Sequence, residues 1–305
     1  MQITGSITAL VTPFAAEGSV DLPAWKRLLR AQLDAGTQGL VVAGSTGEAA
    51  ALDTDEFRLL LGTAVAEVAG AVPVLAGTGF SSTEKTVQQT RLAASLGASA
   101  ALVVTPPYVR PTQEGLLRHY LEVATRGDVP VVLYNVPSRS GCDLLPDTVE
   151  QLLGHERIVG IKEARAEPER MQALLALAGE RFVVLSGDDP TACRAMLAGA
   201  AGCISVASNV VPHAYRGLCD AARAGNAEQA WGLDRELQAV FAFLGCEPNP
   251  IPAKALLSAL GACEDILRLP LLPLSPGPRS GLAALAALVR RLDPPAGAAA
   301  TANSD

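Results

Sequence analysis

Basic residues are scarce in this sequence of 305 residues. Lys and Arg together number 24 against 31 Asp and Glu, and the formal net charge is -7 at pH 7. No run of Lys and Arg is longer than two residues. Because a protein binds the phosphates of a nucleic acid through a basic surface, we expect a small molecule as the ligand and no nucleic-acid partner.

Metal-binding side chains are also few and scattered. The three histidines, His119, His155 and His213, form no His-Glu-x-x-His motif, and the six cysteines form no Cys-x-x-Cys pair. Zinc sites and disulfide frameworks both have recognisable spacings of these residues. We therefore expect no metal, no cofactor and no disulfides, with cysteines that are reduced and mostly buried.

Long apolar runs are absent as well. No stretch reaches the roughly 18 uninterrupted apolar residues that span a membrane, and residues 1–14 lack the charged start and apolar centre of a signal peptide. We therefore expect a cytoplasmic protein without a membrane partner. The 49% hydrophobic and 18% charged residues are typical of a globular protein with a large core, and they name no function.

Short apolar runs alternate with helical patterns as far as about residue 225, which is typical of a parallel sheet built from strand–helix units. A closed (β/α)8 TIM barrel of roughly 250 residues fits this pattern better than a doubly wound sheet of five or six strands. The eight candidate strands are Ile7–Thr12, Gly39–Ala43, Pro73–Gly77, Ala101–Thr105, Val131–Asn135, Val159–Glu163, Phe182–Ser186 and Cys203–Ala207.

The pattern also divides the chain. We predict a (β/α)8 catalytic barrel over residues 1–225, a small C-terminal helical segment over 226–293 and a disordered tail over 294–305. Within the C-terminal segment, helical patterns cover residues 227–244, 252–260 and 280–292. Asp21, Ser81 and Thr112 are expected to begin helices in the barrel, with Ser81 and Glu84 forming a capping box.

TIM-barrel enzymes carry their active sites at the C-terminal ends of the strands. Ser45 and Thr46 follow the second strand in a glycine-flanked turn, which either binds a carboxylate through its backbone N–H groups or is a simple turn. Tyr134, at the end of the fifth strand, either relays protons or packs with a satisfied hydroxyl. Arg139 offers a planar fork for a substrate carboxylate, or forms a surface salt bridge.

Lys162 is one of only four lysines, and no other lysine lies within a predicted strand. Strand alternation puts Val159 and Ile161 on one face and Gly160 and Lys162 on the other, so this lysine points into the barrel. Burial there would disfavour the ammonium form and leave a neutral amine that can attack a carbonyl. A structural lysine that extends to solvent or pairs with an acid would explain the position equally well.

Taken together, the motifs resemble the dihydrodipicolinate synthase/N-acetylneuraminate lyase superfamily over nearly the whole chain. They occur in the family's order. They are Gly5-Ser6 with Thr12-Pro13, GSTGE at 44–48, AGTG at 76–79, TPPYVRP at 105–111, YNVPSRSGCD at 134–143, GIKEA at 160–164, LSGDD at 185–189, EPNPIPAK at 247–254 and RLPLLPL at 268–274.

This resemblance implies a class I lyase that needs no cofactor, with Lys162 forming a Schiff base with pyruvate. Tyr134 would donate and accept protons, and Ser45 and Tyr108 would complete the relay, Tyr108 reaching in from a neighbouring subunit. The resemblance therefore also implies a homo-oligomer, usually a tetramer built as a dimer of dimers.

The same resemblance implies how the substrates are held. Thr46 and the backbone of Ile204 would bind pyruvate, with Gly187 as a further substrate-binding position. Arg139 would hold the carboxylate of L-aspartate 4-semialdehyde, which the synthase branch condenses with pyruvate in diaminopimelate and lysine biosynthesis.

Two other functions stay open, because one fold serves many reactions. The first is an aldolase for a 2-keto-3-deoxy acid or an N-acetylneuraminate-type substrate, and the second is a catalytically silent sensor of keto acids. Ser45 stands where the synthases commonly have threonine, and GSTGE also occurs in neuraminate lyases. Arg139 and the sequence Lys162-Glu163-Ala164 favour the synthase branch.

Members of the family that respond to L-lysine bind it at the dimer interface through imidazole, carboxylate and tyrosine groups, among others. The matching positions here lack those groups, and a lysine stands in place of the acid that would meet the ammonium of the ligand. We therefore expect insensitivity to L-lysine. The positions are Ala49, Thr54, Phe57, Ser81, Lys85 and Pro107.

Overall fold

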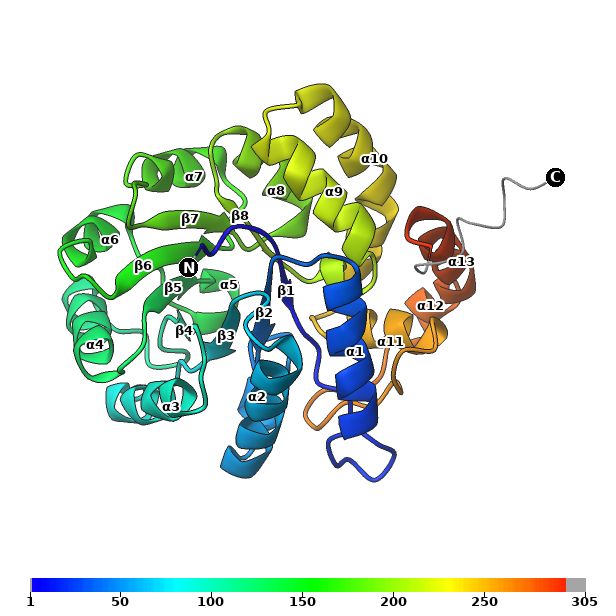
Figure 1. Ribbon diagram of the computed structural model, residues 1–305, viewed down its shortest axis with the longest axis horizontal. Coiled ribbons are helices and arrows are strands. Elements are labelled where there is room, and N and C mark those ends of the chain that lie inside the picture. Colours follow the sequence, from blue (N-terminus) through cyan, green and yellow to red (C-terminus); the bar gives the residue numbers. More distant parts are fainter. Residues whose placement is uncertain (1, 295–305) are drawn as a thin grey trace.

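The computed structural model describes residues 2–294, and its centre is a closed barrel of parallel strands in the order β1 to β8 (Figure 1). The predicted TIM barrel is confirmed, and the strand ends lie within three residues of those expected. Beyond its first residue, the predicted tail over 294–305 lies outside the described residues. The strands are β1 Gly5–Ala9, β2 Gly39–Val42, β3 Val74–Gly77, β4 Ala100–Val104, β5 Val131–Asn135, β6 Ile158–Glu163, β7 Val183–Ser186 and β8 Gly202–Ser205.

Helices surround the strands and follow them along the chain (Figure 1). Short 3₁₀ turns stand at Ala49–Ala51 (η1) and Ala207–Asn209 (η2). The α-helices that accompany the barrel are α1 Leu22–Asp34, α2 Thr54–Val68, α3 Thr83–Ser95, α4 Gln113–Arg126, α5 Pro137–Ser140, α6 Pro146–Leu152, α7 Pro168–Leu175, α8 Asp189–Leu197 and α9 Pro212–Arg223.

The chain after the barrel is helical, as the sequence predicts. Its elements are α10 Ala227–Leu244, α11 Ile251–Ala259, α12 Pro276–Arg279 and α13 Leu282–Leu292. In Figure 1, α11 to α13 lie on the same side of the view as α1, opposite α4 and α6. The exact division between barrel and C-terminal segment at residue 225 stays a prediction. None of the helices within residues 2–294 is long and apolar enough to cross a membrane.

Helix starts follow the expected chemistry with one exception. The Asp21 side chain accepts a hydrogen bond from the backbone of α1, and Thr112 does the same for α4. The predicted cap of α3 at Ser81 is wrong, because the neighbouring Ser82 accepts from the Lys85 backbone N–H. The hydroxyl of Ser81 instead donates to the carbonyl of Pro107 at 2.8 Å, which ties this turn to the loop after β4.

The interior of the barrel is a separate apolar cluster of strand side chains, distinct from the larger cluster between strands and helices. In β6 the simple alternation fails, because its register with β5 shifts by one residue just before Gly160. Val159 packs with the interior cluster, whereas Ile161 packs with the outer one, so the prediction that they share a face is wrong. The cause is a β-bulge, which inserts one extra residue. Pairing then resumes with Lys162 opposite Tyr134.

The barrel closes where β1 meets β8, and glycine is required there. A Cβ on Gly202 would lie 2.3 Å from both the backbone N and the backbone O of Gly5. We expect Gly202→Ala to lower the free energy of unfolding by about 2–3 kcal/mol, because backbone rather than a flexible side chain would have to move. Urea unfolding of both proteins measures this difference.

Gly232→Ala is the matched control, because this glycine lies in α10 with nothing within 4 Å of an added Cβ. That change should stabilise the protein by up to about 1 kcal/mol through helix propensity. Equal unfolding midpoints for the two variants would contradict the steric argument.

Candidate active site

A cavity of about 660 Å³ opens beside the C-terminal ends of the strands. Ser45, Tyr134 and Arg139 line it, so the fold brings together three predicted site residues from different loops and strands. Pro248 and Asn249, from the turn between α10 and α11, line the same cavity. The C-terminal helical segment thus forms part of the wall of a barrel cavity.

Lys162 and Tyr134 form the centre of the site. They are paired in the β5–β6 register, and the Nζ atom of Lys162 lies 4.4 Å from the centroid of the Tyr134 ring. Lys162 is only 5% exposed, which argues against a lysine that extends to solvent. Among the described residues the salt-bridged lysines are Lys26 and Lys254, so the acid-paired alternative for Lys162 also lacks support.

Gly187, which follows β7, makes room for this lysine. A Cβ at position 187 would lie 2.7 Å from Cε and 2.9 Å from Cγ of Lys162. The backbone N–H of Gly187 donates to the carbonyl of Glu163 at 2.7 Å, which keeps the β7 loop against the end of β6. The geometry therefore gives Gly187 a steric reason to be glycine, while its predicted contact with substrate stays a prediction.

A polar cluster on the outer face fixes the ends of β5 and β6. The Asn135 side-chain amide donates to Glu163 at 3.0 Å and to Asp143 at 2.7 Å. Glu163 is fully buried, and burial raises the pKa of its carboxyl, an effect that the Asn135 hydrogen bond opposes. Asn135 and Glu163 follow Tyr134 and Lys162 directly, so this cluster holds the two strand ends in register behind the Lys162–Tyr134 pair.

The turn after β2 is anchored on both sides. Thr12 donates through its hydroxyl to the carbonyl of Gly47 at 2.7 Å, and Thr46 is only 3% exposed. Glu48 has a left-handed backbone with φ 54° and is also buried. Such a strained conformation persists only where surrounding contacts hold it. Ser45 thereby borders the cavity on a rigid turn rather than a mobile loop.

A buried ion pair supplies one of those contacts. Lys254 of α11 lies 2.6 Å from Glu48 and donates to the carbonyl of Ile266 at 2.5 Å, and both charged side chains are almost completely buried. Burial lowers the pKa of Lys254, and the charge of Glu48 raises it part of the way back. Phe14 lies between two cations, with Lys254 Nζ and Arg268 Cζ each 4.2 Å from its ring centroid.

The other five predicted site residues do not line the cavity, and they are Thr46, Tyr108, Lys162, Gly187 and Ile204. Ile204 is completely buried in β8 as part of the interior cluster. Tyr108 is 91% exposed with φ 73°, and it does not line the cavity. Its backbone N–H donates to the carbonyl of Ser140 at 3.1 Å, which positions the loop. A single chain therefore does not bring the Tyr108 side chain to Lys162.

Asn249 and Lys254 lie in the EPNPIPAK motif, but the sequence did not single them out as functional residues. Asn249 donates to the hydroxyl of Thr46 at 2.9 Å, and its carbonyl accepts from Arg139 at 3.0 Å. Asn249 contacts Thr46 and Lys254 contacts Glu48, both some 200 residues earlier in the chain. No local sequence pattern indicates contacts between residues so far apart. The available signal was that a polar asparagine and a lysine stand in an otherwise proline-rich apolar turn.

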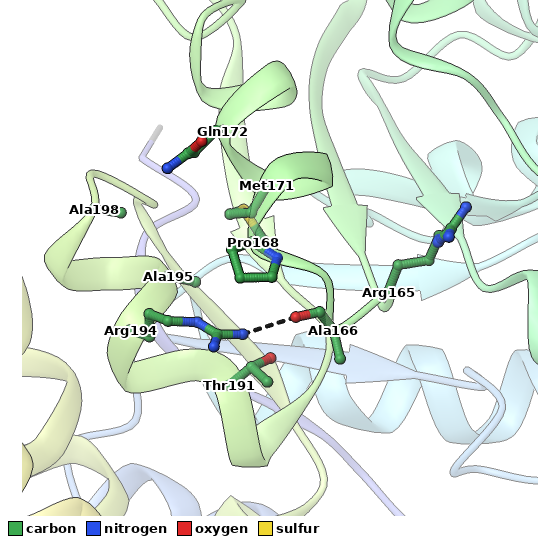
Figure 2. Close-up of a pocket in the computed structure, with 9 residues that line it drawn as sticks. All are labelled: Arg165, Ala166, Pro168, Met171, Gln172, Thr191, Arg194, Ala195 and Ala198. Atoms are coloured by element: carbon green, nitrogen blue, oxygen red, sulfur yellow. Dashed lines mark hydrogen bonds between the residues drawn. The ribbon is translucent and has the colours of Figure 1, made fainter.

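A second, shallower pocket of about 90 Å³ lies between α7 and α8. Figure 2 shows Arg194 directed at the carbonyl of Ala166, with which it forms a 2.7 Å hydrogen bond, while Arg165 points away. Over residues 2–294, no group of three His, Cys, Asp or Glu side chains is arranged to hold a metal ion.

The Glu48–Lys254 pair leads to a stability prediction. Lys254→Met should lower the free energy of unfolding by about 3–5 kcal/mol, because it removes the cation that pairs with the buried Glu48 carboxylate and leaves it the backbone N–H of Arg268. Lys26→Met is the matched control, since Lys26 pairs with Glu67 at 3.5 Å on the surface and should cost less than about 1 kcal/mol. Chemical unfolding at neutral pH compares the two, and similar losses would contradict the buried-pair argument.

Curated relatives are similar to the chain over nearly its full length. A protein of Xanthomonas axonopodis pv. citri named 4-hydroxy-tetrahydrodipicolinate synthase is 64% identical over 275 residues, which is 90% of this chain and 91% of that protein. A protein of Methylococcus capsulatus with the same name is 46% identical over 269 residues, 88% of this chain and 92% of that protein.

Solved structures of dihydrodipicolinate synthases are also similar to the chain. The dihydrodipicolinate synthase of Acinetobacter baumannii, described as chloride inhibited and complexed with pyruvate, has a TM-score of 0.92 and 40% identity over 94% of this chain and 99% of that chain. The enzyme of Aquifex aeolicus has a TM-score of 0.90 and 40% identity over 93% and 97% of the two chains. The family model described as the dihydrodipicolinate synthetase family matches residues 2–288. The chain therefore belongs to the dihydrodipicolinate synthetase family.

Proposed function

We propose that this protein catalyses the reaction of a 4-hydroxy-tetrahydrodipicolinate synthase, the condensation of pyruvate with L-aspartate 4-semialdehyde in diaminopimelate and lysine biosynthesis. The observation that carries the proposal is a buried lysine that has no salt-bridge partner among residues 2–294 and lies 4.4 Å from the ring of Tyr134, which lines a large cavity. The names of relatives that cover about nine tenths of the chain support the same reaction. Its location in the cytoplasm stays a prediction.

Lys162 would begin the reaction. Its Nζ adds to C2 of pyruvate, and loss of water gives an imine. A proton then leaves the methyl group, and the resulting enamine carbon attacks the aldehyde carbon of the second substrate. The amino group of that product attacks the imine carbon, which releases Lys162 and closes the ring.

Tyr134 would transfer protons in these steps, because its ring contacts the lysine and its side chain reaches the cavity. Ser45 and a Tyr108 from a neighbouring subunit would extend the relay. Serine retains the hydroxyl that donates and accepts protons, so its presence in place of threonine should have a modest effect.

Thr46 and the Ile204 backbone would hold the pyruvate carboxylate, with Gly187 beside the lysine. Arg139 would hold the carboxylate of the semialdehyde through its planar fork. An aldolase for 2-keto-3-deoxy acids or sialic acids is the second candidate, and the position of Arg139 on the cavity wall favours a short acidic substrate over a polyol chain. A silent sensor would not need both Lys162 and Tyr134 at this spacing.

Assembly as a homotetramer, a dimer of dimers, is part of the proposal. Its support is the 91% exposed Tyr108, which a neighbouring copy would cover. One structure with a TM-score of 0.89 and 39% identity is described as the first monomeric dihydrodipicolinate synthase variant, so members of this family differ in assembly.

Borohydride treatment in the presence of pyruvate should add a reduced pyruvate group to the peptide that contains Lys162. The reason is that borohydride traps the imine as a stable secondary amine. Mass spectrometry of the digested protein locates the adduct, and Lys162→Arg should abolish it. An adduct on Lys254, or none on wild type, would contradict the mechanism. Turnover of pyruvate with L-aspartate 4-semialdehyde in a coupled assay separates the synthase from an aldolase that uses sugar acids alone.

Tyr108→Phe should reduce kcat by roughly 10²-fold, the usual loss when a proton-transfer group is removed, without changing the unfolding midpoint. Tyr108→Phe and Lys162→Ala chains should then recover activity when unfolded and refolded as a mixture, because a mixed dimer contains one complete site. Refolding each variant alone is the control. Mixtures that stay inactive would contradict a tyrosine shared between subunits.

L-Lysine should not inhibit the enzyme at sub-millimolar concentration. Five of the six positions that match the family's lysine site line the cavity, and none of the six carries a carboxylate that could pair with the ligand's ammonium. Initial rates with increasing L-lysine at constant ionic strength measure the effect. Half-inhibition below about 1 mM L-lysine would overturn the prediction, because it corresponds to a binding free energy stronger than about -4 kcal/mol.

A further inference from the structure

We propose that Asn249 is a positioning residue that prepares two predicted substrate-binding groups, the buried hydroxyl of Thr46 and the guanidinium of Arg139 on the cavity wall. The inference rests on the proposed function, because it assigns the two groups to the carboxylates of pyruvate and of the semialdehyde. It gives a residue of the C-terminal segment a part in a site whose predicted substrate-binding residues all belong to the barrel.

The contact with Thr46 sets the direction of a hydrogen bond. Asn249 Nδ2 donates to Thr46 Oγ1 at 2.9 Å, and in the described part of the chain this hydroxyl has no other side-chain or backbone partner. A hydroxyl has one hydrogen to donate and two lone pairs to accept with. Because the amide occupies a lone pair, the hydrogen of Thr46 is left free for a carboxylate oxygen.

The contact with Arg139 uses the backbone of the same residue. The carbonyl of Asn249 accepts from Arg139 Nη2 at 3.0 Å, which holds one arm of the guanidinium against the cavity wall. The other donors of the fork keep their freedom to meet a second carboxylate. One residue therefore touches both groups through two different atoms, and a substitution can remove the side-chain amide while the backbone carbonyl stays.

Asn249 is itself held in place. Five residues further on, Lys254 forms the buried pair with Glu48, and Glu48 stands two residues after Thr46. The turn that carries Asn249 and the turn that carries Thr46 are thus locked together by a pair with side chains 0% and 1% exposed. Asn249 Oδ1 is buried without a hydrogen-bond partner among residues 2–294, so within this part of the chain the side chain makes its hydrogen bond through the nitrogen alone.

The test compares the pyruvate concentration that gives half-maximal borohydride trapping at Lys162, a readout that needs no second substrate. Asn249→Ala removes the amide but keeps the backbone carbonyl, and should raise this concentration roughly tenfold, the effect of losing one hydrogen bond to a charged group. The KM for the semialdehyde should change much less. Asn249→Asp should raise the pyruvate concentration further, because its carboxylate would accept the Thr46 hydrogen and repel the substrate.

Asn226→Asp is the control for the added charge. Asn226 caps α10 through its side-chain oxygen, a role that aspartate fills equally well, and it does not line the cavity. The Asn226→Asp protein should need the same pyruvate concentration for half-maximal trapping as wild type and should have the same unfolding midpoint. The near-isosteric Asn249→Asp also keeps the test valid if the alanine variant proves unstable.

A double variant shows whether Asn249 acts through Thr46. In a Thr46→Val background, Asn249→Ala should have little further effect on trapping by pyruvate, whereas a residue with a purely structural role would weaken it by the same factor again. The proposal would be overturned if Asn249→Ala weakened pyruvate trapping by the same factor in both backgrounds, or had no effect on wild type. Either result would leave the proposed function intact. Trapping without turnover of the semialdehyde would instead overturn the function, and a wild type that is not trapped would overturn both.

Discussion

The pairing of β5 with β6 is the constraint on which the rest of the site depends. It sets Lys162 directly against Tyr134 inside the barrel, and the bulge at Val159 makes this register possible by inserting one residue before it. The outer face of the same two strand ends carries Asn135 and Glu163, whose hydrogen bond resists sliding of one strand along the other. Barrel geometry thus places the proposed nucleophile and the proposed proton carrier at contact distance before any substrate arrives.

The second constraint is the attachment of the C-terminal segment. A buried lysine and a buried glutamate are costly to remove from water, so the pair stabilises the fold only as long as both partners are present. Its position is informative, because Glu48 belongs to the turn that carries Ser45 and Thr46, and Lys254 follows Asn249 on the other side of the cavity. The segment therefore acts as a fixed wall of the site, and its loss would affect binding as well as stability.

Much of the fold could be predicted from the sequence, because each strand is a short apolar run and several helices have a recognisable start signal. Lys162 could be singled out because lysines are scarce and this one lies within a strand. The side of the barrel sheet on which Val159 packs could not be predicted, since a β-bulge depends on the pairing with the partner strand. Ser81 and Ser82 are equally good caps by local chemistry, and only the contact of Ser81 with Pro107 decides between them. Asn249 and Lys254 escaped notice because their partners are far away in the sequence.

A crystal structure of the protein with pyruvate tests the central claim most directly, because the claim concerns one covalent bond and its surroundings. The account predicts continuous electron density from Lys162 Nζ to C2 of pyruvate, with the pyruvate carboxylate within hydrogen-bond distance of Thr46 Oγ1. Pyruvate bound in the cavity without a bond to Lys162, or joined to a different lysine, would contradict it.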